Sequence, residues 1–250
     1  MINVNSRAIR LRVYCRIVPC MLSGVITILF FAGCDVCNPA DPELTTEEMY
    51  QNAVLDAVIA EENEICSSLI PVIESNEELI WNDGRILAVA FTKYADSYPA
   101  GETVQTWWGD TWVTAFPEIK EFFLNQKTDD KELTLRIEQL LGLPPESGNE
   151  WFAELWVRPE DLFRPSPDPE ITDTVAELDF IDNATEEHIE WFNNNILHSY
   201  FKEEKYPWTR LGYTYDWGNP DNETGLSEFV IKQNSEVIVK SLSSIGEYFQ

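Results

Sequence analysis

Arg85-Ile-Leu-Ala-Val-Ala-Phe-Thr-Lys-Tyr94 is the stretch that decides the fold of this chain. Branched aliphatic and aromatic residues fit pleated strands, so it predicts a strand. Trp151–Val157 alternates in the manner of another strand. The end of the chain adds three more, at 211–217, 225–232 and 236–242, which are separated by Gly- and Asn-rich turns. Strands and helices do not alternate regularly, which favours a largely antiparallel sheet.

A β-hairpin is predicted between these strands. Residues 103–108 and 111–116 are both rich in strand formers, and the pair Gly109-Asp110 separates them. Gly and Asp tolerate the backbone conformation of tight turns, so we expect the two strands to pair with each other.

Helical patterns surround the strands. Thr45 and Glu48 have the spacing of a capping box, which predicts a helix to about Ala60. A second helical piece is expected around Ile65–Ile73, where Pro71 ends or kinks it. Further helices are predicted at 117–125, from Asp129 or Asp130 to Gly142, and from Thr185 to about Phe201. We therefore expect an α+β fold, a single compact domain over residues 44–250 with N-terminal helices followed by a largely antiparallel sheet with packed helices.

Acidic side chains dominate the chain beyond residue 33. Four of the 17 Lys and Arg lie before that point, which leaves 13 against 44 Asp and Glu. Nucleic-acid binding needs Lys and Arg to displace phosphate counterions, so this composition disfavours a nucleic-acid partner. The acidity is typical of a well-solvated surface that stands off anionic headgroups.

Residues 1–33 form a separate basic and apolar segment. They carry four arginines and no Asp or Glu, then the apolar run 17–31, then Ala32 and Gly33 before Cys34. A basic region, an apolar region and small residues, in that order, predict a secretory signal peptide. Arginines on the N-terminal side keep that end in the cytoplasm and direct the remainder outward. The arginines are Arg7, Arg10, Arg12 and Arg16.

The motif Phe31-Ala32-Gly33-Cys34 resembles the lipobox of bacterial lipoproteins, although Phe31 stands where that class usually has Leu. The resemblance covers only the leader. It implies that diacylglycerol is attached to Cys34, and that the mature protein is held to a membrane of the cell envelope by lipid on the exported side. Residues 34–43 would then be a tether. An uncleaved anchor helix is the alternative, because the apolar run approaches the roughly 18 residues that span a bilayer.

The remaining cysteines and the histidines suggest no catalytic or metal site. Export permits a disulfide between Cys37 and Cys66. His188 and His198 lie ten residues apart, on different faces of one predicted helix, whereas metal ligands on a helix are three or four apart. We expect surface or capping roles for both. Hydrolase and phosphate-binding glycine motifs are absent from the sequence, and no cofactor is predicted.

Tyr206-Pro-Trp-Thr-Arg-Leu-Gly-Tyr-Thr-Tyr-Asp-Trp-Gly218 is the most distinctive stretch. Strand alternation would place Leu211 and three aromatic residues on one face. If that face is exposed, it resembles a stacking platform for sugar rings or a partner protein; if it is buried, it belongs to the core. The candidate ligand-binding residues here are Trp208, Arg210, Tyr213, Tyr215 and Trp217.

Residues 158–169 contain four prolines and predict a long, stiff loop. Long ordered loops often carry function, and Arg158 and Arg164 stand out in so acidic a chain, so both are candidate ligand-binding residues. The other interpretation pairs them with nearby carboxylates, namely Glu160, Asp161 or Asp168.

Two acidic clusters could carry chemistry. Asp216, Asn219, Asp221 and Glu223 supply the oxygen atoms that calcium prefers, but their spacing does not match an EF-hand loop, so a plain Asx-type turn is the other interpretation. A second cluster, with the same two kinds of interpretation, consists of Asp168, Glu170 and Asp173.

Two functional hypotheses follow. The first is a non-enzymatic envelope lipoprotein whose domain binds an unknown protein or glycan partner. The second is an envelope hydrolase, perhaps glycan-directed, that uses Asp168, Glu170 or Asp216. An apolar cleft joining two of those carboxylates would favour the enzyme, and their scattering would favour the binder. A convex surface with the aromatic residues buried would weaken both hypotheses and leave a structural role.

Overall fold

The computed structural model describes residues 44–124 and 130–250. The predicted signal peptide, the lipid attachment at Cys34, the tether and the cysteine at 37 lie outside the described residues. Within the described ranges, none of the helices is both long enough and apolar enough to cross a membrane.

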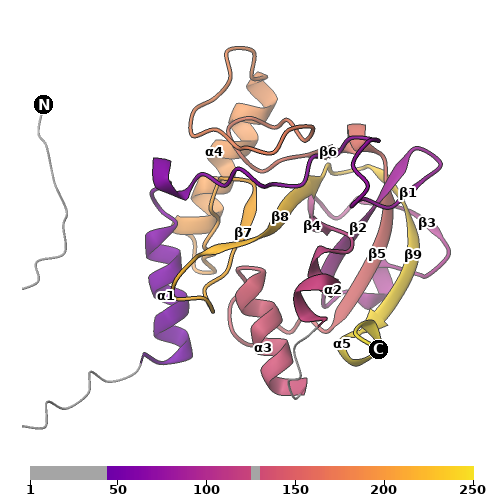
Figure 1. Ribbon diagram of the computed structural model, residues 1–250, viewed down its shortest axis with the longest axis horizontal. Helices are drawn as coiled ribbons and strands as arrows, with labels where there is room; N and C mark the ends of the chain where they lie inside the picture. Colours follow the sequence, from indigo (N-terminus) through magenta and orange to yellow (C-terminus); the bar gives the residue numbers. More distant parts are fainter. Residues whose placement is uncertain (1–43, 125–129) are drawn as a thin grey trace, which may run out of the picture. The chain divides into compact units, whose positions relative to one another are not determined.

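The described strands form one antiparallel sheet of nine strands, shown in Figure 1. Its order is β3-β9-β5-β2-β4-β8-β6, with β1 beside β2 and β7 beside β8. Strand β2, from the stretch that starts at Arg85, lies between β5 and β4 and pairs with β5 along its length, which confirms that prediction. The strands are β1 Trp81–Asn82, β2 Arg85–Thr92, β3 Thr103–Gln105, β4 Thr111–Ala115, β5 Trp151–Val157, β6 Leu162–Phe163, β7 Tyr213–Tyr215, β8 Thr224–Ile231 and β9 Glu236–Ser244.

Five α-helices lie in the described ranges and confirm the α+β class. Only α1 precedes the first strand, so the expected order of several N-terminal helices followed by strands is not confirmed. Figure 1 shows α1 and α4 on the side of β7, away from β9. Helices α2 and α5 pack on the sheet, while α3 contacts α5 and β7. The helices are α1 Thr46–Asp56, α2 Glu118–Phe123, α3 Asp130–Leu140, α4 Glu186–Phe201 and α5 Ile245–Tyr248, with 3₁₀ turns at Glu62–Glu64, Ala95–Ser97 and Pro159–Asp161.

Local capping signals fix several helix ends. Thr45 forms the expected capping box with Glu48 at the start of α1, which ends at Asp56, earlier than predicted. Thr185 caps α4 by accepting a hydrogen bond from the backbone N–H of His188 at 3.2 Å. Gly142, with φ of +65°, follows α3 closely. That left-handed conformation suits glycine and stops the helix.

The helical piece predicted around Ile65–Ile73 is wrong. This segment is neither helix nor strand, and its backbone bonds to the segment that follows β6. Leu69 N donates to Thr174 O at 3.0 Å, and Val72 N donates to Ile171 O at 2.6 Å. These long-range hydrogen bonds satisfy backbone groups on both sides of Pro71, which has no N–H to donate.

The predicted hairpin at Gly109-Asp110 is also wrong. Strand β3 pairs with β9, and β4 lies between β2 and β8. The Asp110 carboxylate accepts hydrogen bonds from Gln233 N at 2.9 Å and from Trp191 Nε1 at 2.7 Å. The turn between the two strands is therefore held by distant partners rather than by a two-strand ladder.

The two faces of the sheet carry separate cores. On β2, Ala88 and Ala90 belong to a core that includes Phe229 and is covered by the segments around Val72 and Ile171. The opposite face carries a second core, in which apolar side chains of the sheet pack under α2, α3 and α5. Its members include Val89, Phe152, Ile119, Ile137, Leu140 and Tyr248. The candidate site continues this second face toward α4.

Candidate functional site

A pocket of about 420 Å³ lies where the second face of the sheet meets α4. The sheet contributes residues of β2, β4, β5 and β8, and the walls come from α4, the segment 206–208, β7 and the residues that follow α3. The lining residues are Val89, Phe91, Trp112, Val113, Thr114, Ile119, Leu141, Gly142, Leu143, Phe152, Asn195, His198, Ser199, Tyr206, Pro207, Trp208, Tyr213, Thr214, Tyr215 and Glu228.

The strand register places the carboxyl group of Glu228 on the part of the sheet that lines the pocket. Thr114 of β4 pairs with Val89 of β2 on one side and with Glu228 of β8 on the other. Side chains directly opposite each other on neighbouring strands point to the same face. Glu228 therefore shares a row with Val89, which belongs to the second core.

The Glu228 carboxyl group has no hydrogen-bond partner within the described part of the chain. The residue is half-buried and lines the pocket. Burial raises the pKa of Glu228 to about 8, from an ordinary value of 4.5. The group is mostly a neutral acid at pH 7, able to donate one hydrogen bond and to ionise if a cation arrives.

Helix α4 brings a second unpaired polar group to the pocket. The Nδ2 atom of Asn195 is buried and has no partner among the described residues. His198 and Ser199 line the pocket from the same helix. A buried amide donor without a partner costs roughly 1–3 kcal/mol, so a ligand or water that accepts from it is favoured.

Three predicted ligand-binding residues line this pocket, although they form no exposed platform. Trp208 and Tyr213 are almost fully buried, and Tyr215 is half-buried. Their polar atoms bond elsewhere: Trp208 Nε1 donates to Pro165 O, Tyr213 OH to Glu64 O, and Tyr215 OH to Asp56. Burial also raises the pKa of both tyrosines. The rings serve as pocket wall while their polar atoms hold the fold.

The expected alternation along residues 211–217 is wrong. The ladder between β7 and β8 shifts register between Tyr213 and Tyr215, and the residues predicted for the opposite face, Gly212, Thr214 and Asp216, are buried as well. Trp217 lies outside the pocket lining, where it packs edge-on against Tyr50 and donates Nε1 to Leu143 O.

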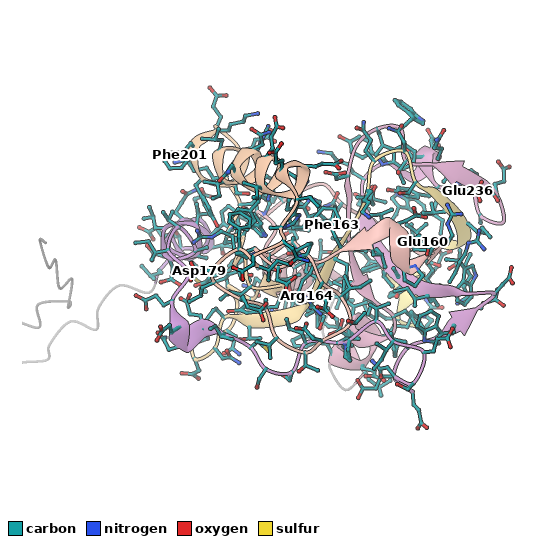
Figure 2. The ribbon with its side chains drawn as sticks, turned by 90° about the horizontal axis from the view of Figure 1, so that it is seen from above. Glu160, Phe163, Arg164, Asp179, Phe201 and Glu236 are labelled. Carbon is teal, nitrogen blue, oxygen red and sulfur yellow. The ribbon has the colours of Figure 1, made fainter. Side chains whose placement is uncertain are left out.

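Arg164 and Arg210, which were predicted to bind a ligand, instead donate hydrogen bonds to backbone carbonyls. Arg164 is fully buried, donates to Glu170 O and Asp173 O at 3.0 Å each, and has its guanidinium 5.3 Å from the Phe229 ring. Desolvation lowers its pKa. Arg210 donates to the carbonyls of residues 57 and 58. Figure 2 shows Arg164 in the interior of the domain, far from Glu236 at the periphery. Both arginines are structural.

The loop that carries Arg158 is ordered by an ion pair. Arg158 Nε lies 2.9 Å from Asp161 and 3.7 Å from Glu160, as the ion-pair interpretation expects. The loop contains the 3₁₀ turn Pro159–Asp161 and the short edge strand β6. None of these residues lines the pocket.

None of the predicted acidic residues lines the pocket. Burial raises the pKa of Asp173, and Asp168 and Glu170 stay close enough to raise it further. Asp216 is buried and forms a bidentate pair with Arg136, at 2.7 and 2.6 Å. Asp168 Oδ1 accepts from Glu170 N at 2.9 Å. Asn219 accepts from Asp221 N, as in an Asx turn. Among the described residues, no three acidic, His or Cys side chains are grouped to hold a metal. Cys66 is a free thiol there, while its predicted disulfide partner is not described.

The two histidines differ. The surface role expected for His188 is wrong: its side chain is buried, its Nε2 lies 2.8 Å from Ser166 O, and its ring stacks on Trp191. Burial lowers its pKa. His198 is exposed, as predicted, at the rim of the pocket.

Comparison with known proteins adds no relative: no family model, no curated protein and no solved structure matches the chain. The functional argument therefore rests on the geometry of the pocket and on the leader sequence. Sequence reasoning missed Glu228 and Asn195. The available signal for Glu228 was a single acid within the otherwise uncharged stretch 225–231.

Proposed function

We propose that this protein is an exported, lipid-anchored binding protein of the bacterial cell envelope, and that its domain holds a small ligand in the pocket around Glu228. The pocket carries the proposal: its walls are mainly apolar and aromatic, and two polar groups in it, on Glu228 and Asn195, have no partner among the described residues. Concave, apolar sites with a few convergent polar groups are typical of ligand binding. The leader and Cys34 support export and lipid anchoring.

The shape of the site favours a small ligand over a broad partner surface. A flat platform for a protein or a long glycan needs exposed aromatic rings, whereas Trp208 and Tyr213 are buried to 4% and 1% exposure. The pocket volume lies within the usual range for small-molecule sites. Aromatic walls and one carboxyl group suit a molecule with a hydrophobic body and a single polar end.

Binding is favoured over hydrolysis by the number of carboxyl groups. Glycoside hydrolysis uses a pair of carboxyl groups set about 5 or 9 Å apart. Among the described residues that line the pocket, Glu228 is the one acid. The acids suggested for a hydrolase, such as Asp216 and Asp168, make structural contacts elsewhere.

The test is calorimetric titration of the full chain carrying Cys34→Ala with two water-soluble probes, 4-phenylbutan-1-ol and 4-phenylbutylammonium chloride. A tryptophan at Asn195 fills the pocket, whereas a tryptophan at the neighbouring Asn194, which is exposed on the same helix, does not. We expect at least one probe to bind wild type and Asn194→Trp, and to lose binding in Asn195→Trp.

Circular dichroism establishes that both variants are folded. Should Asn195→Trp unfold the domain, competition serves instead: the binding of one probe must be weakened by the other, because a single pocket holds one of them at a time. Failure of both probes to bind, or binding that a folded Asn195→Trp leaves unchanged, would refute the proposal.

A further inference from the structure

The charge pattern in and around the pocket is one-sided. Among its described lining residues, Glu228 is the one acid, and none is Lys or Arg. His198, at the rim, is the one basic side chain there. An anionic ligand would find no Lys or Arg in this lining to pair with, and it would lie beside another acid, Glu228. A neutral ligand would leave Glu228 protonated in an apolar site.

Aromatic rings surround the space that a ligand would fill. Phe91, Trp112 and Phe152 come from the sheet, and Trp208 and Tyr215 come from the chain beyond α4. The faces of such rings attract ammonium groups by about 0.5–2 kcal/mol, and more strongly where water is excluded. Trp and Tyr rings beside a carboxyl group are the combination that a cation with an apolar body prefers.

An acidic groove adjoins the pocket. It shares Leu143 and Tyr206 with the pocket and has a volume of about 690 Å³. Four of its lining residues are glutamates and two are lysines, so its net charge is negative. The chain as a whole carries a formal charge of −27. Such a field concentrates cations near the site and repels anions. The charged lining residues are Glu47, Glu146, Glu203, Glu204, Lys93 and Lys205.

We infer that the ligand is a cation, an ammonium group on an aliphatic or aromatic body, and that Glu228 is its counter-ion. This inference rests on the proposed function and names the ligand class of the same pocket. An ammonium donates to the Glu228 carboxyl oxygens, which have no partner among the described residues, and places its apolar body against the rings. No lysine or arginine of the described lining competes for the carboxylate.

Binding is coupled to a proton. The titratable groups that line the pocket with Glu228 are His198 of α4, Tyr206 of the segment after it, and Tyr213 and Tyr215 of β7. Burial raises the pKa of each of these tyrosines, so they stay neutral at pH 7. Because Glu228 is mostly protonated in the free protein, an arriving ammonium makes it ionise, and its proton passes to the buffer.

The experiment compares the two isosteric probes, 4-phenylbutylammonium and 4-phenylbutan-1-ol, on the full chain with Cys34→Ala at pH 7. We expect the ammonium to bind at least about tenfold more tightly, since a hydrogen bond to a charged group is worth about 1.5–3 kcal/mol. Titration in phosphate and in Tris should show close to one proton released with the ammonium and none with the alcohol.

Glu228→Gln is the matched variant, because glutamine has the shape of the protonated acid. It should lose about tenfold in ammonium affinity, keep alcohol affinity within about threefold, and abolish proton release. Equal affinity of wild type for the two probes, or an ammonium affinity unchanged in Glu228→Gln, would overturn the cation inference while the proposed pocket function stands. Absence of binding by either probe would remove the proposed function itself.

Discussion

The burial of Glu228 predicts a measurable dependence of stability on pH. Its pKa is about 8 in the folded chain and 4.5 as the ordinary value, so the folded state holds this proton more tightly than the unfolded state. The free energy of unfolding therefore falls as pH rises from about 4.5 through about 8. Each pKa unit corresponds to about 1.4 kcal/mol. Between pH 5 and pH 8, wild type should lose about 3 kcal/mol from this group, a loss that Glu228→Gln lacks.

Urea unfolding followed by tryptophan fluorescence at pH 5, 6, 7 and 8 measures this difference. Other buried acids also titrate, notably Glu118, whose pKa burial raises to about 7. They act equally in wild type and variant, so the difference between the two isolates Glu228. Glu190→Gln, on an exposed position of α4, is the control and should follow wild type. Parallel pH profiles for wild type and Glu228→Gln would refute the reasoning.

Five further substitutions test the fold and the leader. Arg164→Met should cost more than about 2 kcal/mol in urea unfolding, because several backbone carbonyls lose their donor; a loss under about 1 kcal/mol would contradict this. Gly212→Ala should cost about as much in urea unfolding, because Gly212 has φ of +73° and a Cβ there would lie 2.6 Å from Arg164 Cδ. Gly246→Ala is the control: its Cβ would have no heavy atom within 4 Å, so this substitution should be neutral or stabilising. Thr45→Ala should cost about 1 kcal/mol by removing the α1 cap, and no change would argue against it. Cys34→Ala should abolish radiolabelled palmitate incorporation and membrane fractionation; an unlabelled wild type that stays membrane-bound would indicate an anchor helix.

Local physics made part of the fold predictable. The capping residues Thr45 and Thr185 act on N–H groups three residues away, and Gly142 acts on the helix that it ends. Such effects are complete within a few residues of sequence. The strand within residues 85–94 could also be predicted from sequence, because its aliphatic and aromatic residues suit burial on both faces of a sheet.

Partners in the sheet were not predictable in the same way. Residues 109–110 look like a hairpin turn, yet β3 pairs with β9 and β4 with β2 and β8. The segment 65–73 has helix-compatible residues, yet it bonds to residues 171–174. In both places long-range hydrogen bonds outweigh local preference, and no window of sequence contains both partners.

The candidate site depended on that same register. Trp208, Tyr213 and Tyr215 were identified from composition, and they do line the pocket. Glu228 was missed because its importance comes from lying opposite Thr114 on an apolar face, which only the pairing of β4 and β8 establishes. The burial of the Asn195 amide likewise depends on the packing of α4 against the sheet, which the sequence does not show.

Strand β9 is the last strand in sequence, yet it lies inside the sheet, which affects the order of folding. This strand, residues 236–244, lies between β3 and β5, which are made long before it. Until it arrives, β5 has an open edge and β3 has no neighbour, so the sheet closes only after most of the chain has been synthesised. Topologies of this kind fold slowly and expose strand edges on the way. A chain truncated before residue 236 would leave the β5 edge unpaired and be prone to edge-to-edge aggregation.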